Sequence, residues 1–286
     1  MDRKHIILTR FNLAVKFGCE KRSDSTVPAE MPWLDKEYLR KRFEIFEKYT
    51  FQSMKRQING NFQWLVLFHK ETPGEFLRKI DSYQKDLKQF APVFLDDEQC
   101  SHLTEVIRGY LTEKYENCDI ITTRIDNDDV VHPLFTDTIQ NELKAGIFSE
   151  NTIISYKNGL QYDIVTRDIL RYDYWKNHFI SLLCVSGGGE HILQYNHDTI
   201  DTLPVMKIRK ETEIPLWVEI ISDSNYSNAE RWTFGAPFVS YKVKEWYPEF
   251  SYRWKSSAGY IFYVVNSVIR MFFSKTGNFC KMFLHN

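Results

Sequence analysis

The sequence predicts an α/β protein whose first half is built on a mostly parallel sheet. Short apolar runs and amphipathic helical segments alternate four times over residues 1–145, an order typical of parallel strands joined by crossover helices. The runs are apolar throughout, as expected for strands that helices cover on both faces. A cluster of carboxylates directly follows the fourth run, at the position where an α/β sheet binds its ligands.

The first expected strand spans residues 5–12 and ends in polar groups. Its apolar run predicts a buried strand whose tip reaches a ligand site. Arg10 lies at that tip, where a guanidinium can clamp a diphosphate; a surface salt bridge is an equally good interpretation. Residues 13–36, with scattered Gly, Ser and Pro, predict a long irregular loop, and loops of this length are usually functional or mobile.

Further strands and helices follow in alternation. A helical stripe of apolar residues covers 37–57 and stops at Asn59-Gly60. Asp96 or Asp97 is expected to cap a later helix that runs towards residue 115. Between them, the pattern predicts a buried strand at 64–68, a helix at 72–89 and a strand at 92–95.

The fourth strand, 119–123, leads directly into an acidic loop. Asp126, Asp128 and Asp129 lie within four residues, and Pro133 suits the first turn of a following helix. Carboxylates this close repel one another unless a cation or a donor-rich partner neutralises them. Mg²⁺ and Mn²⁺ bind one or two such carboxylates and complete their coordination with water and phosphate. A solvated turn with an N-cap is the simpler alternative.

The pattern changes after residue 145. Residues 151–156 and 160–166 flank Lys157-Asn158-Gly159, and Asn-Gly predicts a hairpin turn between two strands. The glycines at 187–189 have no phosphate-loop pattern around them, and we interpret them as a flexible hairpin loop near the site. Two further strands are expected in this half, at 179–185 and 191–195.

Composition and charge exclude several classes of protein. The 37 Lys and Arg residues balance 38 Asp and Glu residues, so no basic field predicts a nucleic-acid partner. The five cysteines are scattered and contain no CxxC pair, which indicates reduced thiols and argues against a zinc site or a disulfide scaffold. We expect a cytoplasmic protein, because no signal peptide is evident and no apolar segment reaches about 20 residues.

The C-terminal extension, residues 241–286, differs from the rest of the chain in charge and in apolar content. It contains no acidic residue after Glu249, while five Lys and Arg residues follow. Its segment 260–273 is strongly apolar but short. A basic, aromatic-rich helix of this kind could make a peripheral contact with an anionic membrane. A helix docked on the protein core is the alternative, and the pattern favours it.

Four segments together carry a resemblance to a known family. They are Leu8-Thr9-Arg10-Phe11-Asn12, the helical stretch 40–49, residues 61–68 and the acidic stretch 122–129. Their order over about residues 5–235 resembles the putative rhamnosyltransferase family of GT-A glycosyltransferases. The resemblance implies a GT-A fold over residues 1–240. Its Rossmann-like half, 1–145, would bind a nucleotide-sugar, and its mixed half, 146–240, would shape the acceptor pocket.

The resemblance also implies roles for individual residues. Thr9, Arg10 and Arg124 would line the nucleotide-sugar pocket with Asp126. Asp126 and Asp128 would hold Mn²⁺ or Mg²⁺ against the donor diphosphate, with Asp128 as the direct ligand and Asp126 nearer the ribose. The leaving nucleoside diphosphate accumulates negative charge, which a cation stabilises.

One departure from the family affects the expected metal site. Members of the family often carry His-Gly where this chain has Ser222-Asp223. A histidine there could be a third metal ligand. In this chain either Asp223 takes that role or the metal site is weaker.

An inverting transferase also needs a carboxylate that deprotonates the acceptor hydroxyl. Four acids of the second half are candidates by position: Glu190, Asp198, Asp201 and Asp223. Glu190 follows the glycine run and Asp198 follows a histidine, so we rank these two first. For each of them, a solvated surface acid is the simpler interpretation.

The sequence therefore predicts a metal-dependent glycosyltransferase that moves a sugar from a dTDP-, UDP- or GDP-sugar. Rhamnose is the sugar that the family name suggests, and the expected acceptor is a glycan or lipid-linked glycan of a surface polysaccharide. A sugar-phosphate nucleotidyltransferase is one alternative, although residues 13–18 lack its Gly-rich loop. A non-catalytic glycan-binding module, with a purely structural acidic loop, is the other.

Overall fold

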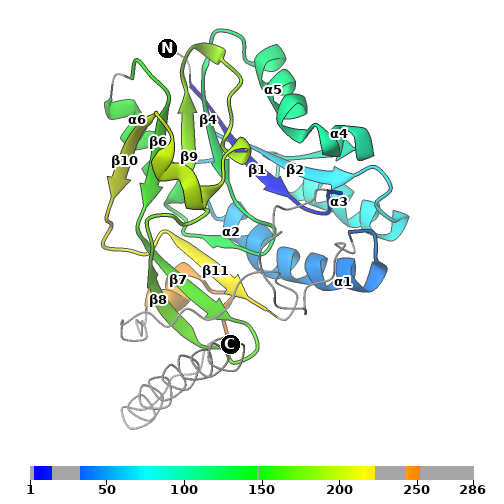
Figure 1. Ribbon diagram of the computed structural model, residues 1–286. Coiled ribbons are helices and arrows are strands. Elements are labelled where there is room, and N and C mark those ends of the chain that lie inside the picture. The colour runs from blue at the N-terminus through cyan, green and yellow to red at the C-terminus, as the bar shows by residue number, and fades with distance from the viewer. Residues whose placement is uncertain (1–2, 15–32, 147, 223–241, 252–286) are drawn as a thin grey trace, which may run out of the picture.

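The computed structural model describes residues 3–14, 33–146, 148–222 and 242–251, and Figure 1 shows their arrangement around two sheets. The larger sheet has seven strands in the order β10-β6-β9-β4-β1-β2-β3. Only β9 runs antiparallel to its neighbours. The strands are β1 (Arg3–Arg10), β2 (Gln63–His69), β3 (Phe90–Leu95), β4 (Asp119–Arg124), β6 (Thr152–Tyr156), β9 (Ser181–Cys184) and β10 (Met206–Lys210).

The smaller sheet is mixed and comes mainly from the second half of the chain. Its order is β5-β11-β7-β8, with β11 parallel to β7 and antiparallel to β5. This pair of sheets confirms the predicted fold class, a mostly parallel sheet followed by a mixed one. The strands are β5 (Val130–Val131), β7 (Asn158–Asp163), β8 (Ile169–Asp173) and β11 (Trp217–Ile221).

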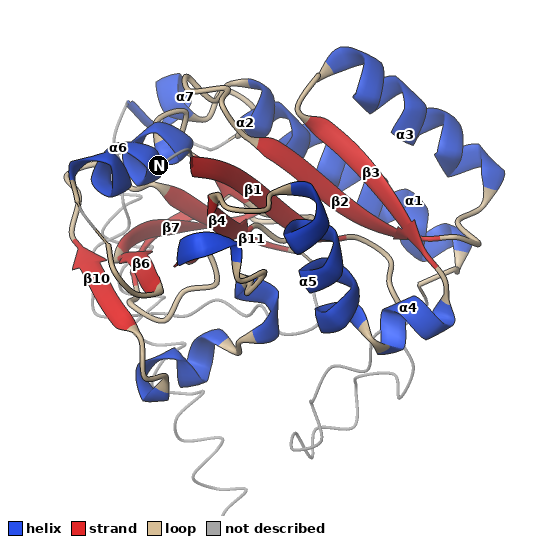
Figure 2. Ribbon diagram, turned by 90° about the horizontal axis from the view of Figure 1, so that it is seen from above, coloured by secondary structure: helices blue, strands red, loops and turns tan. Residues whose placement is uncertain are grey.

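Helices cover both faces of the larger sheet, as the sequence predicts. Ile80 of α3 packs with Trp64 on one face, whereas Leu111 of α5 packs with Leu8 on the other. Figure 2 shows α3 and α5 on opposite sides of the strands. The helices are α1 (Lys36–Ile45), continued by a π-helical turn (Phe46–Thr50) and α2 (Phe51–Lys55), then α3 (Gly74–Asp86), α4 (Asp97–Ser101), α5 (Leu103–Lys114), α6 (Phe135–Ala145) and α7 (Lys242–Trp246).

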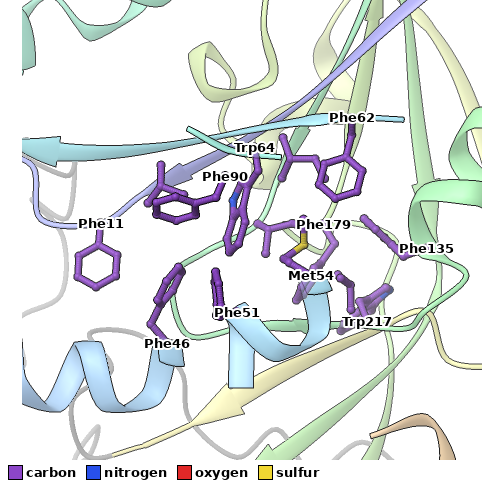
Figure 3. Close-up of a cluster of buried hydrophobic side chains, with 14 of the residues drawn as sticks. Phe11, Phe46, Phe51, Met54, Phe62, Trp64, Phe90, Phe135, Phe179 and Trp217 are labelled. Carbon is purple, nitrogen blue, oxygen red and sulfur yellow. The ribbon is translucent and has the colours of Figure 1, made fainter. Parts of the chain in front are cut away.

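Aromatic side chains join the helix face to the sheet. Phe46 lies 5.5 Å from Trp64 between ring centroids, and Phe51 lies 4.7 Å from Tyr83. Phe11, just after β1, lies 4.4 Å from Phe43 of α1. Figure 3 shows the rings of Phe11, Phe46, Phe51 and Trp64 between the helices and the strands. The tip of β1, where a ligand site is expected, is therefore fixed by the core directly beneath it.

The predicted hairpin at Asn158-Gly159 is wrong. Both residues belong to β7, and β6 and β7 lie in different sheets because the chain crosses between them at Lys157. Gly159 is needed for close packing instead: an added Cβ would lie 2.3 Å from the Trp217 ring. The glycine thus permits a close approach of a large side chain, which is a common reason for glycine within strands.

The segment after β9 also differs from the prediction. Residues 192–194 form a 3-10 turn in place of a strand, with the Ile192 amide donating to Thr122 Oγ1 at 2.9 Å. Gly187 has a positive φ and packs against Asn117 and Tyr115, at the end where β4 begins. The glycine run therefore lies at the opposite end of β4 from the acidic loop.

Two other expectations fall outside the described residues: most of the loop at 13–36, and the apolar segment 260–273. The last described segment, residues 242–251, is well packed. Phe250 stacks on Tyr162 at 4.2 Å between ring centroids, and Arg56 pairs with Glu249 at 2.7 Å. Within the described ranges, none of the helices has the length and apolar character needed to cross a membrane.

A buried hydrogen-bond chain crosses the larger sheet at His5. The Gln140 amide donates to His5 Nδ1, so the ring is neutral and its Nε2–H donates to Thr123 Oγ1 at 2.8 Å. Thr123 and Ser181 hydroxyls lie 2.6 Å apart. Burial lowers the pKa of His5 to about 3.

We expect this histidine to make the protein sensitive to acid. A folded-state pKa below the unfolded value of 6.5 contributes stability that is complete above pH 6.5 and is lost as the pH falls towards 3. Between pH 8 and pH 5, His5 should lower the free energy of unfolding by about 2 kcal/mol. Urea titrations of wild type and His5→Gln measure this. The decrease in the free energy of unfolding from pH 8 to pH 5 should be smaller in His5→Gln than in wild type, and unchanged in the exposed His102→Gln. An equal decrease in all three proteins would contradict the assignment.

Candidate active site

The acidic loop lies at the carboxyl end of β4, beside the carboxyl end of β1. The Thr9 hydroxyl donates to the Ile125 carbonyl at 2.7 Å and accepts from the Trp64 indole at 2.9 Å. The Ile125 amide donates to the Leu8 carbonyl at 3.2 Å, and the Asp129 amide closes a turn onto the Asp126 carbonyl at 3.2 Å. The parallel pairing of β1 and β4 thus positions the start of the loop.

Asp126 is held by a two-point interaction with Arg124. Arg124 donates to both carboxylate oxygens, at 2.9 and 2.6 Å. Burial opposes ionisation of Asp126, but the Arg124 guanidinium outweighs it and holds the pKa of the carboxyl well below its usual range. Burial and the nearby Arg124 charge lower the pKa of Arg10 to about 10, while Asp126 acts in the opposite direction. Two arginines and one carboxylate therefore lie together at this edge.

Asp129 faces a histidine from the second half of the chain. His178 Nε2 lies 2.5 Å from Asp129 Oδ2, and the Ile220 amide donates to Oδ1 at 3.1 Å. Burial raises the pKa of Asp129 to about 7. Burial would lower the pKa of His178, but the charge of Asp129 outweighs it and raises that pKa to about 9. Asp129 thus connects the loop both to His178 and to β11 of the smaller sheet.

Asp126, Asp129 and His178 each direct one ligand atom to a common point. These three atoms lie within 4.8 Å of one another. Two ligands on opposite sides of a divalent ion lie roughly 4 to 5 Å apart, so the spacing suits such an ion. Carboxylates and an imidazole are both ligands of divalent ions, so the donor set as a whole could hold one.

The other expected site residues are distributed unevenly. Arg124, Arg10 and Asp126 lie together, and Thr9 lies beneath them, fully buried and hydrogen-bonded within the fold. Asp128 does not join the three-residue cluster; its carboxylate faces Arg42 of α1 at 3.0 Å. Asp223 lies outside the described residues.

The two acids ranked first as catalytic base occupy different places. Glu190 accepts from the Asn151 amide, whose oxygen accepts from the Val185 amide, at the end where β4 begins. Asp198 is mostly exposed and lies 3.6 Å from His197, whose ring centroid is 5.9 Å from that of His178. The structure brings Asp198 to the edge of the cluster and leaves Glu190 at the far end of the sheet.

A family described as "Putative rhamnosyl transferase" matches residues 4–233 of the chain. The chain belongs to this family. Membership assigns the protein to the glycosyltransferases, as the four sequence segments indicate. No curated protein matches the chain.

Several solved structures resemble this transferase distantly. S. aureus TarS 1–349 superposes with a TM-score of 0.41 at 8% identity, covering 77% of this chain and 60% of TarS 1–349. Its complex with UDP-GlcNAc gives 0.41 at 6% identity, covering 78% and 59%. A putative nucleotide-diphospho-sugar transferase from Desulfovibrio desulfuricans G20 gives 0.34 at 9%, covering 78% and 83%. The transferase thus spans about 60% of the TarS 1–349 chain.

Sequence reasoning missed two residues that contact the acidic loop, Arg42 and His178. His178 leads into β9, whose Ser181 pairs with Thr123 of β4 in antiparallel register. Pairing of the expected strand 179–185 with β4 would have placed His178 beside the acidic loop. Arg42 carries no such signal, because its contacts with the loop depend on how α1 packs.

Removing the Thr9 hydroxyl should destabilise the transferase. Thr9→Val keeps the side-chain shape but leaves the Trp64 N–H and the Ile125 carbonyl each without this partner. A buried polar group that loses its partner costs about 1 to 3 kcal/mol. Urea denaturation measures the loss.

Thr50→Val is the matched control. Thr50 is equally buried, and its hydroxyl has no hydrogen-bond partner among the residues that the structure describes, so its removal should be neutral or stabilising. Equal losses in both variants would contradict the role of Thr9.

Proposed function

We propose that the protein transfers a sugar from a nucleoside-diphosphate donor to a hydroxyl of a glycan acceptor. The observation that supports it most is the convergence of Asp126, Asp129 and His178 at the edge where β1 and β4 end, with Arg10 and Arg124 beside them. Bound diphosphate needs positive charge, and a divalent ion needs carboxylates; this edge offers both. Family membership supports the same reaction.

Asp126, Asp129 and His178 would hold a divalent ion, for which Mn²⁺ fits the donor set best. When bound, the ion supplies positive charge to the diphosphate as it leaves. Arg10 and Arg124 would add hydrogen bonds to the same phosphates. His178 must release the Nε2 proton that it now shares with Asp129 before that nitrogen can bind a metal.

The structure suggests Glu219 as the base for the acceptor hydroxyl. Four Asp and Glu residues are buried in the described chain, and Asp119, Asp128 and Asp129 each face a cation. Among the described residues Glu219 faces no cation, and its carboxylate accepts from the Gln161 amide at 2.6 Å. A buried carboxylate without a cation is costly to keep, which favours a functional role.

The register of β11 directs Glu219 towards the site. Val218 pairs with Val130, and the Ile220 amide donates to Asp129 Oδ1 at 3.1 Å, so Glu219 lies on the stretch of β11 that runs beside Asp129. Glu219 shares its face of the strand with Trp217, because side chains alternate. Trp217 stacks on Phe179 at 5.1 Å, and Phe179 on His178 at 4.4 Å. The carboxylate therefore lies on the side that His178 approaches.

The donor and acceptor are proposed at a coarser level. The family name supports rhamnose as the sugar. A dTDP-, UDP- or GDP-sugar and a surface glycan or lipid-linked glycan are the partners that we propose with it.

Calorimetric titration of dTDP, UDP and GDP, with and without Mn²⁺, tests the donor site. We expect one nucleotide to bind tightly only with Mn²⁺, and Asp126→Asn to weaken that binding by more than about 10-fold, since it removes a charge that holds the ion. Asp86→Asn, which changes an exposed carboxylate paired with Lys55, should bind as wild type does. Failure of all three nucleotides to bind would contradict the proposal.

Glu219→Gln tests the base. Release of nucleoside diphosphate from the preferred donor should fall by about 10² to 10⁴, the usual contribution of a general base, while Mn²⁺-dependent nucleotide binding stays unchanged. Glu211→Gln, an exposed acid paired with Lys157, is the control. Wild-type release by Glu219→Gln, with a loss in Asp198→Asn or Glu190→Gln, would assign the base to one of those residues.

A further inference from the structure

The three aspartates of the loop have different surroundings. The side chain of Asp126 is 28% exposed, whereas those of Asp128 and Asp129 are 8% and 1% exposed. Each faces a different cation: Arg124 next to the loop, Arg42 on α1, and His178 before β9. Three neighbouring carboxylates therefore point in three directions, and only two of them face the common point of the cluster.

The turn itself explains this division. The Asp129 amide donates to the Asp126 carbonyl, so Asp126 and Asp129 are the first and last residues of one turn. The ends of such a turn lie close together, whereas its third residue lies at the far side. Asp128 is that third residue, and its carboxylate accordingly points towards α1.

Arg42 fixes the far side of the turn. It donates to Asp128 Oδ2 at 3.0 Å and also to the Asn127 side-chain oxygen. The Asn127 amide donates in turn to the Phe11 carbonyl at 2.9 Å. This chain of contacts connects α1, the loop and the end of β1. Arg42 and Asp128 are both almost fully buried.

Asp128 Oδ2 accepts from Arg42, and an ion that bound this oxygen would have to displace the guanidinium. The guanidinium would then stay buried without its counterion, which is strongly unfavourable. Asp129 carries no such obstacle on its cluster side, because its partner His178 is itself a member of the three-residue cluster and offers a ligand atom of its own. The arrangement thus favours Asp129 over Asp128 as the second carboxylate ligand.

We propose that Arg42 and Asp128 are a positioning pair that shapes the loop, and that Asp126 and Asp129 hold the divalent ion together with His178. The ligand spacing is then Asp-x-x-Asp in place of the Asp-x-Asp that the sequence pattern indicates. This inference rests on the proposed function, because it assigns the ligands of the ion that the donor site uses.

Mn²⁺ binding to the full-length protein tests the assignment without any substrate. Electron paramagnetic resonance of free Mn²⁺ gives the affinity of wild type, Asp128→Asn and Asp129→Asn. Both variants remove one charge, and an asparagine at 128 can still accept from Arg42. We expect Asp129→Asn to weaken Mn²⁺ binding by more than about 100-fold, beyond the 10- to 100-fold typical of residues behind the ligands. Asp128→Asn should weaken it by less than about 10-fold.

The electron spin echo spectrum of bound Mn²⁺ supplies a readout that stability alone does not change. The nitrogen signal of His178 should be present in wild type and in Asp128→Asn, and absent in His178→Gln. Arg42→Lys keeps the charge but loses the second hydrogen bond to Asn127, so it should weaken Mn²⁺ binding by about 10-fold and keep the signal. Asp86→Asn is again the surface control.

The outcomes separate this inference from the proposed function. If Asp128→Asn weakens Mn²⁺ binding as much as Asp129→Asn does, and both variants are folded by circular dichroism, Asp128 is a ligand and the inference is wrong. If the wild-type protein binds neither Mn²⁺ nor any of the three nucleotides, the proposed function fails, and the inference fails with it.

Discussion

The architecture of the site depends on the repulsion among Asp126, Asp128 and Asp129. Carboxylates this close stay ionised only when opposite charge or hydrogen-bond donors reach each of them. Here each receives a separate cation from a separate part of the chain. The loop is therefore stable only when α1, β4 and the segment before β9 are all in place. The conformation of the loop therefore depends on contacts from several parts of the fold.

Asp129 also joins the two sheets. It directly precedes β5, which pairs with β11, and its carboxylate accepts from the Ile220 amide of β11. The smaller sheet, which would face the acceptor, thus takes its position from Asp129, which also belongs to the three-residue cluster that would hold the metal. Gly159 allows Trp217 to pack closely against β7, and that packing sets the face on which Glu219 lies. One short strand, β5, thus connects the acidic loop to the smaller sheet.

Much of the first half could be predicted from local patterns. Apolar runs identify β1, β2 and β4 because parallel strands are buried on both faces, and Asp126 follows one of them. The second half resisted the same reasoning. Asn158-Gly159 has the local chemistry of a turn, but the packing of Trp217 overrides it. Residues 192–194 are apolar enough for a strand, yet Thr122 captures the Ile192 amide in a 3-10 turn.

The sequence by itself determined the alternating α/β order, the acidic loop and the family. Each of these follows from short segments whose residues are close together in the chain. Tertiary structure alone decided what Asp128 and Asp129 face. Arg42 lies 86 positions before Asp128, and His178 lies 49 positions after Asp129. A local pattern cannot show which of three adjacent carboxylates meets which distant cation, because that depends on how helices and sheets pack.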